Sequence, residues 1–153
     1  MNRLTAAAFA ALALLAPSFA GSSEVCPTTP NSAGAGAVLD YVHDAAPELA
    51  AFNVTGCPGP SFGALIYSSL SQPPAPFGNG SLCVRPFVAG SGMMRAVRVT
   101  PEGVAAFTVA EGQQAQAWPF AVGCFAQFMY RDELAGGALF NLSNAIRTEA
   151  PAP

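Results

Sequence analysis

The chain has 153 residues, of which 52% are hydrophobic and 10% are charged. Its six basic residues are all arginine, and its nine acidic residues outnumber them, which gives a formal net charge of −3. This balance weighs against a nucleic-acid partner, because such proteins present a basic face. The 15 Gly and 14 Pro, with few helix-forming charged residues, favour short strands and turns over a helical bundle.

Residues 1–20 have the three parts of a secretory signal peptide. Arg3 supplies the positive start, residues 4–17 form an apolar run, and Ser18-Phe-Ala20 offers small residues for cleavage. We therefore expect cleavage near Ala20 and a product that is secreted, periplasmic or held at the cell surface. No later apolar stretch is long enough to predict a transmembrane segment in the mature chain.

Four cysteines, Cys26, Cys57, Cys83 and Cys124, lie in the predicted mature chain. An even number in an exported protein favours two disulfides, and four cysteines allow three pairings between which the spacing does not choose. Their spacing matches no metal motif, and one histidine is too few for a usual zinc site. No metal or cofactor is predicted.

After the signal peptide we expect a linker-like lead-in at residues 21–36, one domain at 37–149 and a disordered tail at 150–153. The pattern predicts an all-β antiparallel sandwich of jelly-roll or Ig-like type. Residues 71–80 are expected to form a Pro- and Gly-rich loop. About eight strands are expected, at residues 37–42, 49–55, 62–70, 82–88, 93–100, 104–109, 118–130 and 139–148.

Two of these strands differ in how clearly they are marked. From Trp118 to Tyr130 every even-numbered position is apolar, which is typical of one face of a buried strand. In contrast, the apolar residues around position 40 also fit the spacing of a helix: Val38, Tyr41, Val42 and Ala45. We prefer the strand at residues 37–42, since Pro47 would stop a helix there.

Ser61 lies in a G-x-S-x-G sequence, the pattern of the nucleophile elbow in α/β hydrolases. That elbow needs a strand before the serine and a helix after it, with the histidine later in the chain. Here Pro58 and Pro60 precede the serine, a strand is expected after it, and His43 comes earlier. A turn is the preferred interpretation, and no catalytic residue is predicted.

Two groups of polar residues are candidates for binding a cation. Asp40, His43 and Asp44, with Glu48 nearby, would share one face of a helix but divide between the faces of a strand. We prefer a solvated edge or loop for this group. The second group joins Asp132-Glu133 to Asn141 and Asn144, whose oxygens suit calcium. A surface pair between Arg131 and these acids is preferred there.

Aromatic side chains and sequons complete the candidates. Five aromatic residues are of the kind that stack on a sugar ring, although core packing is preferred: Tyr41, Tyr67, Trp118, Phe125 and Tyr130. Phe77 and Phe87, near the loop, are expected to be more exposed. Asn53, Asn79 and Asn141 begin N-x-S/T sequences, which matter only in a host that glycosylates.

Five segments of the chain carry recognisable short motifs: residues 26–34 (a PNS-x-G start), 56–58, 76–84 (a PFGNG-x-x-CV loop), 127–132 (ending in YRD) and 140–145 (FNLS-x-A). Taken in this order, they resemble an uncharacterised family of exported bacterial proteins. The resemblance implies a β-rich module, often at the end of larger secreted proteins, and no known activity. This chain lacks the cysteine often found in the family's final strand, so Cys124 becomes the expected partner of Cys26, with Cys57 joined to Cys83.

The function expected from the sequence is that of an exported, non-enzymatic module that is structural or binds a surface or extracellular component, such as a polysaccharide or a protein. The alternative is a carbohydrate-binding module that uses Tyr67, Phe77 and Trp118 on one face. The remote alternative is a secreted hydrolase that uses Ser61 or the group at residues 40–44.

Overall fold

The computed structural model describes residues 21–44, 49–94, 96–109 and 123–149. Within them the chain is all-β, with antiparallel pairing throughout and one short 3-10 turn, η1 (Glu133–Ala135). The predicted signal peptide and C-terminal tail lie outside the described residues. The strands are β1 (Ser22–Cys26), β2 (Val38–Asp44), β3 (Leu49–Thr55), β4 (Ser61–Ser68), β5 (Ser71–Phe77), β6 (Gly80–Val84), β7 (Gly92–Met93), β8 (Val97–Val99), β9 (Ala105–Val109), β10 (Phe125–Arg131) and β11 (Phe140–Thr148).

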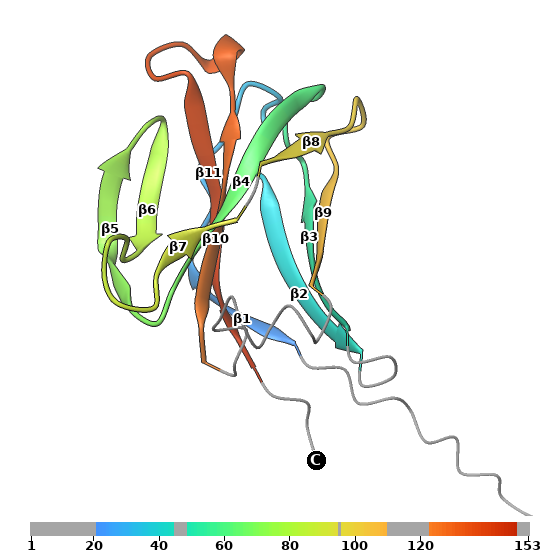
Figure 1. The fold of residues 1–153 in the computed structure, drawn as a ribbon. Coiled ribbons are helices and arrows are strands. Elements are labelled where there is room, and N and C mark those ends of the chain that lie inside the picture. The colour runs from blue at the N-terminus through green and yellow to red at the C-terminus, as the bar shows by residue number, and fades with distance from the viewer. Residues whose placement is uncertain (1–20, 45–48, 95, 110–122, 150–153) are drawn as a thin grey trace, which may run out of the picture.

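The strands form three layers (Figure 1). A central sheet has the order β1-β11-β10-β4-β7, with β8 also paired to β4. The sheet β2-β3-β9 covers one of its faces, and the hairpin β5-β6 lies against the other. The central sheet is therefore covered on both sides, which explains why its strands are apolar on both faces.

The side chains of strand β10 point alternately into two hydrophobic cores, one on each face of the central sheet. Ala126, Phe128 and Tyr130 belong to the cluster beneath β2-β3-β9, whereas Phe125 and Met129 pack against the cluster beneath the hairpin. Successive side chains of a strand point to opposite faces, so the even and odd positions fill different layers. The period-two pattern predicted for this region is confirmed over residues 125–131, and residues 110–122 lie outside the described part.

The antiparallel sandwich is confirmed, with eleven strands among the described residues instead of about eight. The strand expected at residues 37–42 is β2, and the one expected at residues 93–100 is divided into β7 and β8. The expected loop at residues 71–80 instead begins with β5. Pro73 and Pro74 are compatible with this strand because β5 is an edge strand, and its register with β6 is irregular between Ser71 and Ala75.

The expected lead-in at residues 21–36 is only partly a connection. Ser22 to Cys26 form β1, which pairs with β11 and makes one edge of the central sheet. The later part is held by Asn31, whose side-chain amide donates hydrogen bonds to the Gly56 carbonyl (2.7 Å) and to the Tyr130 hydroxyl (3.3 Å). The domain therefore includes this segment.

The expected disulfide pairings are wrong. Cys26 is bonded to Cys83, with 6.2 Å between their Cα atoms, while Cys57 and Cys124 are free and buried. The layers give the reason: Cys26 and Cys83 both belong to the cluster beneath the hairpin, and Cys57 belongs to the cluster on the other face. Cys124 comes directly before β10, and its thiol lies close enough to Tyr41, a member of the same cluster as Cys57, to add to the effect of burial in raising the pKa of Tyr41.

Candidate functional site

An apolar groove lies where the hairpin leaves the central sheet partly uncovered. It consists of two adjoining pockets of about 380 Å³ and 530 Å³, which share three lining residues, Phe77, Met93 and Met129. Because the pockets share these residues, they form one elongated depression. We call it the apolar groove and define it by Phe62, Ile66, Phe77, Phe87, Met93 and Met129.

Strand alternation builds the floor of the apolar groove. Ile66 of β4 belongs to the core beneath the hairpin, so Phe62, four residues earlier, projects from the same face. Met93 of β7 is the register partner of Ile66, and Met129 of β10 is the partner of Ala64. The hairpin contributes Phe77 from one side, whose ring contacts Phe140 at a centroid distance of 5.1 Å.

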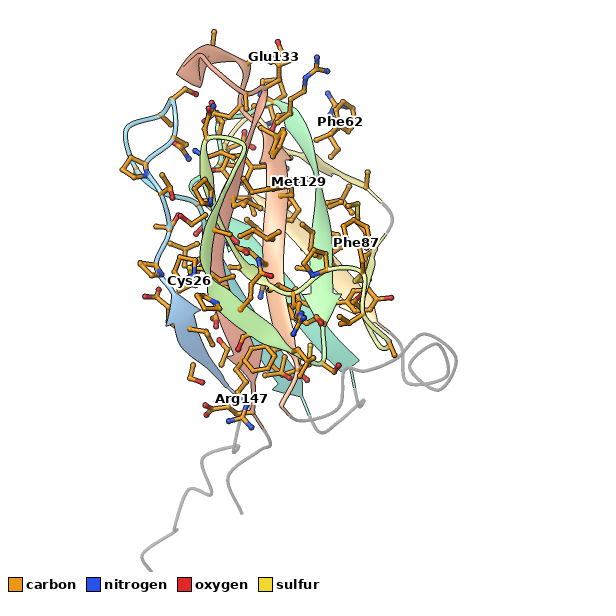
Figure 2. The ribbon with its side chains drawn as sticks, turned by 90° about the vertical axis from the view of Figure 1, so that its left-hand side faces the viewer. Cys26, Phe62, Phe87, Met129, Glu133 and Arg147 are labelled. Carbon is orange, nitrogen blue, oxygen red and sulfur yellow. A yellow bond between two sulfur atoms is a disulfide. The ribbon has the colours of Figure 1, made fainter. Side chains whose placement is uncertain are left out.

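The groove gathers the exposed aromatic side chains of the described residues. Phe62 is 59% exposed, Phe77 40%, Phe87 98% and Met93 56%, and no other phenylalanine in the described ranges is classed as exposed. Figure 2 shows Phe62, Met129 and Phe87 on the same side of the molecule. A contiguous exposed apolar surface of this kind is typical of a binding site.

Phe87 has a backbone conformation that a bulky residue rarely adopts. Its φ is +61°, in the left-handed region, where a residue other than glycine is strained. The following turn is fixed by Ser91, whose hydroxyl accepts a hydrogen bond from the Val88 amide (3.0 Å) and donates one to the Val88 carbonyl (2.7 Å). The chain thus presents the ring to solvent at a conformational cost, which is a feature of functional sites.

The end of the groove beyond Phe62 is polar. Arg131 lines the groove there and is ion-paired with Glu133, with 2.5 Å between Nε and Oε1, and both side chains are more than half exposed. A further pocket of about 350 Å³ adjoins Phe62 and Arg131 and is lined also by Ser61 and Asp132. The groove therefore has an apolar body and one polar end.

Ser61 is the first residue of β4, directly after the bend at residues 59–60, where a turn was expected. Its hydroxyl donates a hydrogen bond to the Pro58 carbonyl (2.9 Å), and it begins β4, so a strand and not a helix follows it. His43 belongs to β2, in the sheet on the other side of the core. The geometry of a nucleophile elbow is not formed.

The two predicted groups of cation ligands are not assembled in the described part of the chain, where no three His, Cys, Asp or Glu side chains come together. Asp40 lies on a strand and is exposed, and its carboxylate accepts hydrogen bonds from the Ser22 hydroxyl and the Tyr41 amide. Glu48 and the side chains of His43 and Asp44 lie outside the part of the chain that the structure describes. Asn144 bonds to Leu39 of β2, away from Asp132.

Asp132 is buried and not part of the surface ion pair. Its Oδ2 accepts hydrogen bonds from the Ser32 amide (3.1 Å) and from Asn141 Nδ2 (3.5 Å), while its Oδ1 has no partner among the described residues. Burial raises the pKa of the neighbouring Cys57 thiol to about 12, and the charge of Asp132 adds to this shift. The predicted surface pair is formed by Arg131 and Glu133.

The predicted sugar-binding aromatics are not brought to one face. Phe77 lies in the groove, but Tyr67 follows Ile66 on β4 and so projects from the opposite face, over Gly92. Trp118 lies outside the described residues. Of the three sequons, that of Asn53 is exposed, Asn79 bonds to the chain at residues 136–138, and Asn141 is fully buried.

Sequence reasoning missed Phe62 and Met93 as candidate binding residues, whereas Phe87 was expected to be exposed near the loop. The alternation of residues 61–68 places Phe62 on the face of Ile66, and this signal was present in the sequence. The sequence does not show that the hairpin leaves Phe62 exposed, nor that Phe87 adopts a positive φ. These depend on how distant segments pack.

Comparisons with known proteins give no further information about this site. No family model matches the chain, and searches of curated proteins and of solved structures gave no significant match. The resemblance to an exported bacterial family therefore stays a prediction. Among the described residues, no helix is long and apolar enough to cross a bilayer.

Proposed function

We propose that this protein is an exported, non-enzymatic binding module that holds an apolar ligand in the apolar groove. The observation that carries the proposal is that Phe62, Phe77 and Phe87 all border one groove together with Met93. Burying such side chains against a ligand contributes about 25 cal/mol for each Å² of apolar surface removed from water.

An apolar ligand is favoured over a carbohydrate because the groove offers few hydrogen-bonding side chains. Three lining residues have polar side chains, and each is already engaged: Arg131 is paired with Glu133, the Ser91 hydroxyl bonds to Val88, and the Tyr130 hydroxyl accepts a hydrogen bond from Asn31. A sugar needs both a stacking ring and partners for its hydroxyl groups. The surroundings of Ser61 likewise favour a binding role over hydrolysis.

Export is part of the proposal and is supported by two features. Residues 1–20 have the pattern of a signal peptide. The bond between Cys26 and Cys83 is of a kind that persists in oxidising compartments. Such a cross-link suits a module that works outside the cytoplasm.

The test is binding of the uncharged fluorescent probe N-phenyl-1-naphthylamine to the purified protein. We expect enhanced fluorescence on binding, and at least about tenfold weaker binding by the Met93→Asp variant, because a buried carboxylate without a partner is costly. Val104→Asp is the matched control, since Val104 is 40% exposed and does not line the groove. Circular dichroism checks that both variants are folded.

Two results would overturn the proposed function. One is the absence of any fluorescence enhancement with the folded protein. The other is equal binding by the Met93→Asp and Val104→Asp variants, because the probe would then bind elsewhere.

A further inference from the structure

We infer that the ligand is a long-chain fatty acid, with its alkyl chain in the apolar groove and its carboxylate at Arg98. This inference rests on the proposed function and adds the chemistry of the ligand's head. It follows from where the described arginines lie in a chain that is acidic as a whole.

Arg98 is placed at the polar end of the groove by strand pairing. It is the register partner of Phe62 in the antiparallel pair of β8 and β4. Residues directly opposite in such a pair project from the same face, with their Cβ atoms about 5 Å apart. The exposed Arg98 side chain therefore stands beside Phe62, at the margin of the groove: Phe62 lines the groove, and Arg98 itself lines neither pocket.

The charges at this end favour an anion. Arg131 lies there as well, but Glu133 already pairs with it. Asp132 is buried, and its Oδ2 is turned to the Ser32 amide and Asn141. The exposed part of this end thus carries two guanidinium groups against one carboxylate, and among the described residues Arg98 has no ion pair.

The groove itself suits a chain more than a compact ligand. The two pockets join end to end through Phe77, Met93 and Met129, and each lies in the usual range for small-ligand sites, about 300–1,000 Å³. Methionine side chains adapt to irregular apolar shapes, and two of them line the junction. An alkyl chain would lie along this junction with its head towards Phe62.

A membrane surface is a less suitable partner. Binding to anionic lipid surfaces relies on clusters of several basic residues, whereas this chain has six arginines in total and a net charge of −3. A monomeric amphiphile needs only one cation at the end of the groove.

The experiment measures displacement of N-phenyl-1-naphthylamine by palmitate and by hexadecanol, which has the same chain but no charge. We expect palmitate to displace the probe at a lower concentration. In the Arg98→Gln variant, palmitate should bind about fivefold more weakly, the usual limit for an exposed charge pair, with hexadecanol and the probe unchanged. Arg147→Gln is the matched control, because Arg147 lies at the opposite end of the molecule from Phe62 (Figure 2).

The outcomes separate the two proposals. Equal displacement by palmitate and hexadecanol, or unchanged palmitate binding by Arg98→Gln, would overturn the fatty-acid inference while probe binding still supports the groove. Failure of the probe itself to bind would overturn the proposed function. Co-sedimentation with phosphatidylglycerol vesicles but no displacement by palmitate would overturn the inference in favour of a membrane surface.

Discussion

The side-chain amide of Gln127 pairs with the backbone around Cys83 much as a neighbouring strand would. Its Oε1 accepts a hydrogen bond from the Cys83 amide (3.0 Å), and its Nε2 donates to the carbonyls of Ser81 and Ser143, both at 2.8 Å. The Gln127 side chain is fully buried between the central sheet and the hairpin. The hairpin is thus joined to the sheet by this amide and by the Cys26–Cys83 bond.

Replacing Gln127 with leucine should lower the free energy of unfolding by about 3 kcal/mol, because a buried N–H and two carbonyls lose their partner. Gln72→Leu is the matched control: Gln72 is half-buried and donates one hydrogen bond, to the Leu82 carbonyl, so a loss near 1 kcal/mol is expected. Urea unfolding measures both changes. Equal losses for the two variants would contradict the role assigned to Gln127.

Asn144 holds the opposite layer in a similar way. Its Oδ1 accepts a hydrogen bond from the Leu39 amide (2.6 Å) and its Nδ2 donates to the Leu39 carbonyl (3.1 Å), which joins β11 to β2. Asn144→Leu should therefore lower the free energy of unfolding by about 2 kcal/mol, since both backbone groups of buried Leu39 lose their partner.

The control for this prediction is Asn53→Ala, at an exposed position of β3, which should change stability by less than about 0.5 kcal/mol. Thermal unfolding followed by circular dichroism compares the two variants. Retention of the full unfolding temperature by Asn144→Leu would show that other contacts hold β2 in place.

The β-sandwich could be predicted because the patterns that indicate it are formed by residues close together in the sequence. The alternation along β10 and the turn residues between strands mark an all-β chain without knowledge of the partners. The same alternation separates Phe128 from Met129, so the existence of two apolar faces was visible in the sequence. The prediction of a surface pair at Arg131 needed only neighbouring residues and is confirmed for Glu133.

The remaining features depend on contacts between distant segments. The cysteine pairing follows from which face of the central sheet each cysteine occupies, and that requires the strand order. Asn141 and Asn144 were candidate ligands because their side chains are polar, yet their amides bond to backbone more than 100 residues away in sequence. The groove exists because the hairpin packs mainly over β11 and β10 and leaves Phe62 of β4 exposed, which no local pattern encodes.

The Cys26–Cys83 bond should contribute about 4 kcal/mol to stability, because it closes a loop over a sequence separation of 57 residues. Peptide mapping without reductant should recover these two cysteines linked and Cys57 and Cys124 as thiols that react only after unfolding. Reduction should lower the urea midpoint, and the Cys124→Ala variant should lose as much on reduction as the unmodified protein. Recovery of a peptide linking Cys57 to Cys83 would contradict the pairing.

The two free thiols should make the protein sensitive to alkali. Burial raises the pKa of both Cys57 and Cys124 from 9.0 to about 12, with the charge of Asp132 adding to the shift at Cys57. The unfolded chain releases these protons near pH 9, so between about pH 9 and 12 the folded state binds more protons and loses stability as the pH rises. Burial also raises the pKa of the Tyr130 hydroxyl from 10.0 to about 12, which adds to the loss above pH 10.

We therefore expect the free energy of unfolding to be constant with respect to these groups below about pH 9 and to fall steadily above it. Urea unfolding measured from pH 7 to 11 tests this, and the Cys57→Ala/Cys124→Ala double variant, although less stable at pH 7, should show a shallower fall. Ellman's reagent gives an independent measurement, because both buried thiols should react slowly in the folded protein even at pH 9. Two results would contradict this prediction: an equal fall of the free energy of unfolding with pH in the double variant, or rapid reaction of the native thiols. Either would show that Cys57 and Cys124 titrate as they do in water. The packing around these side chains would then be looser than their burial of 95% or more requires.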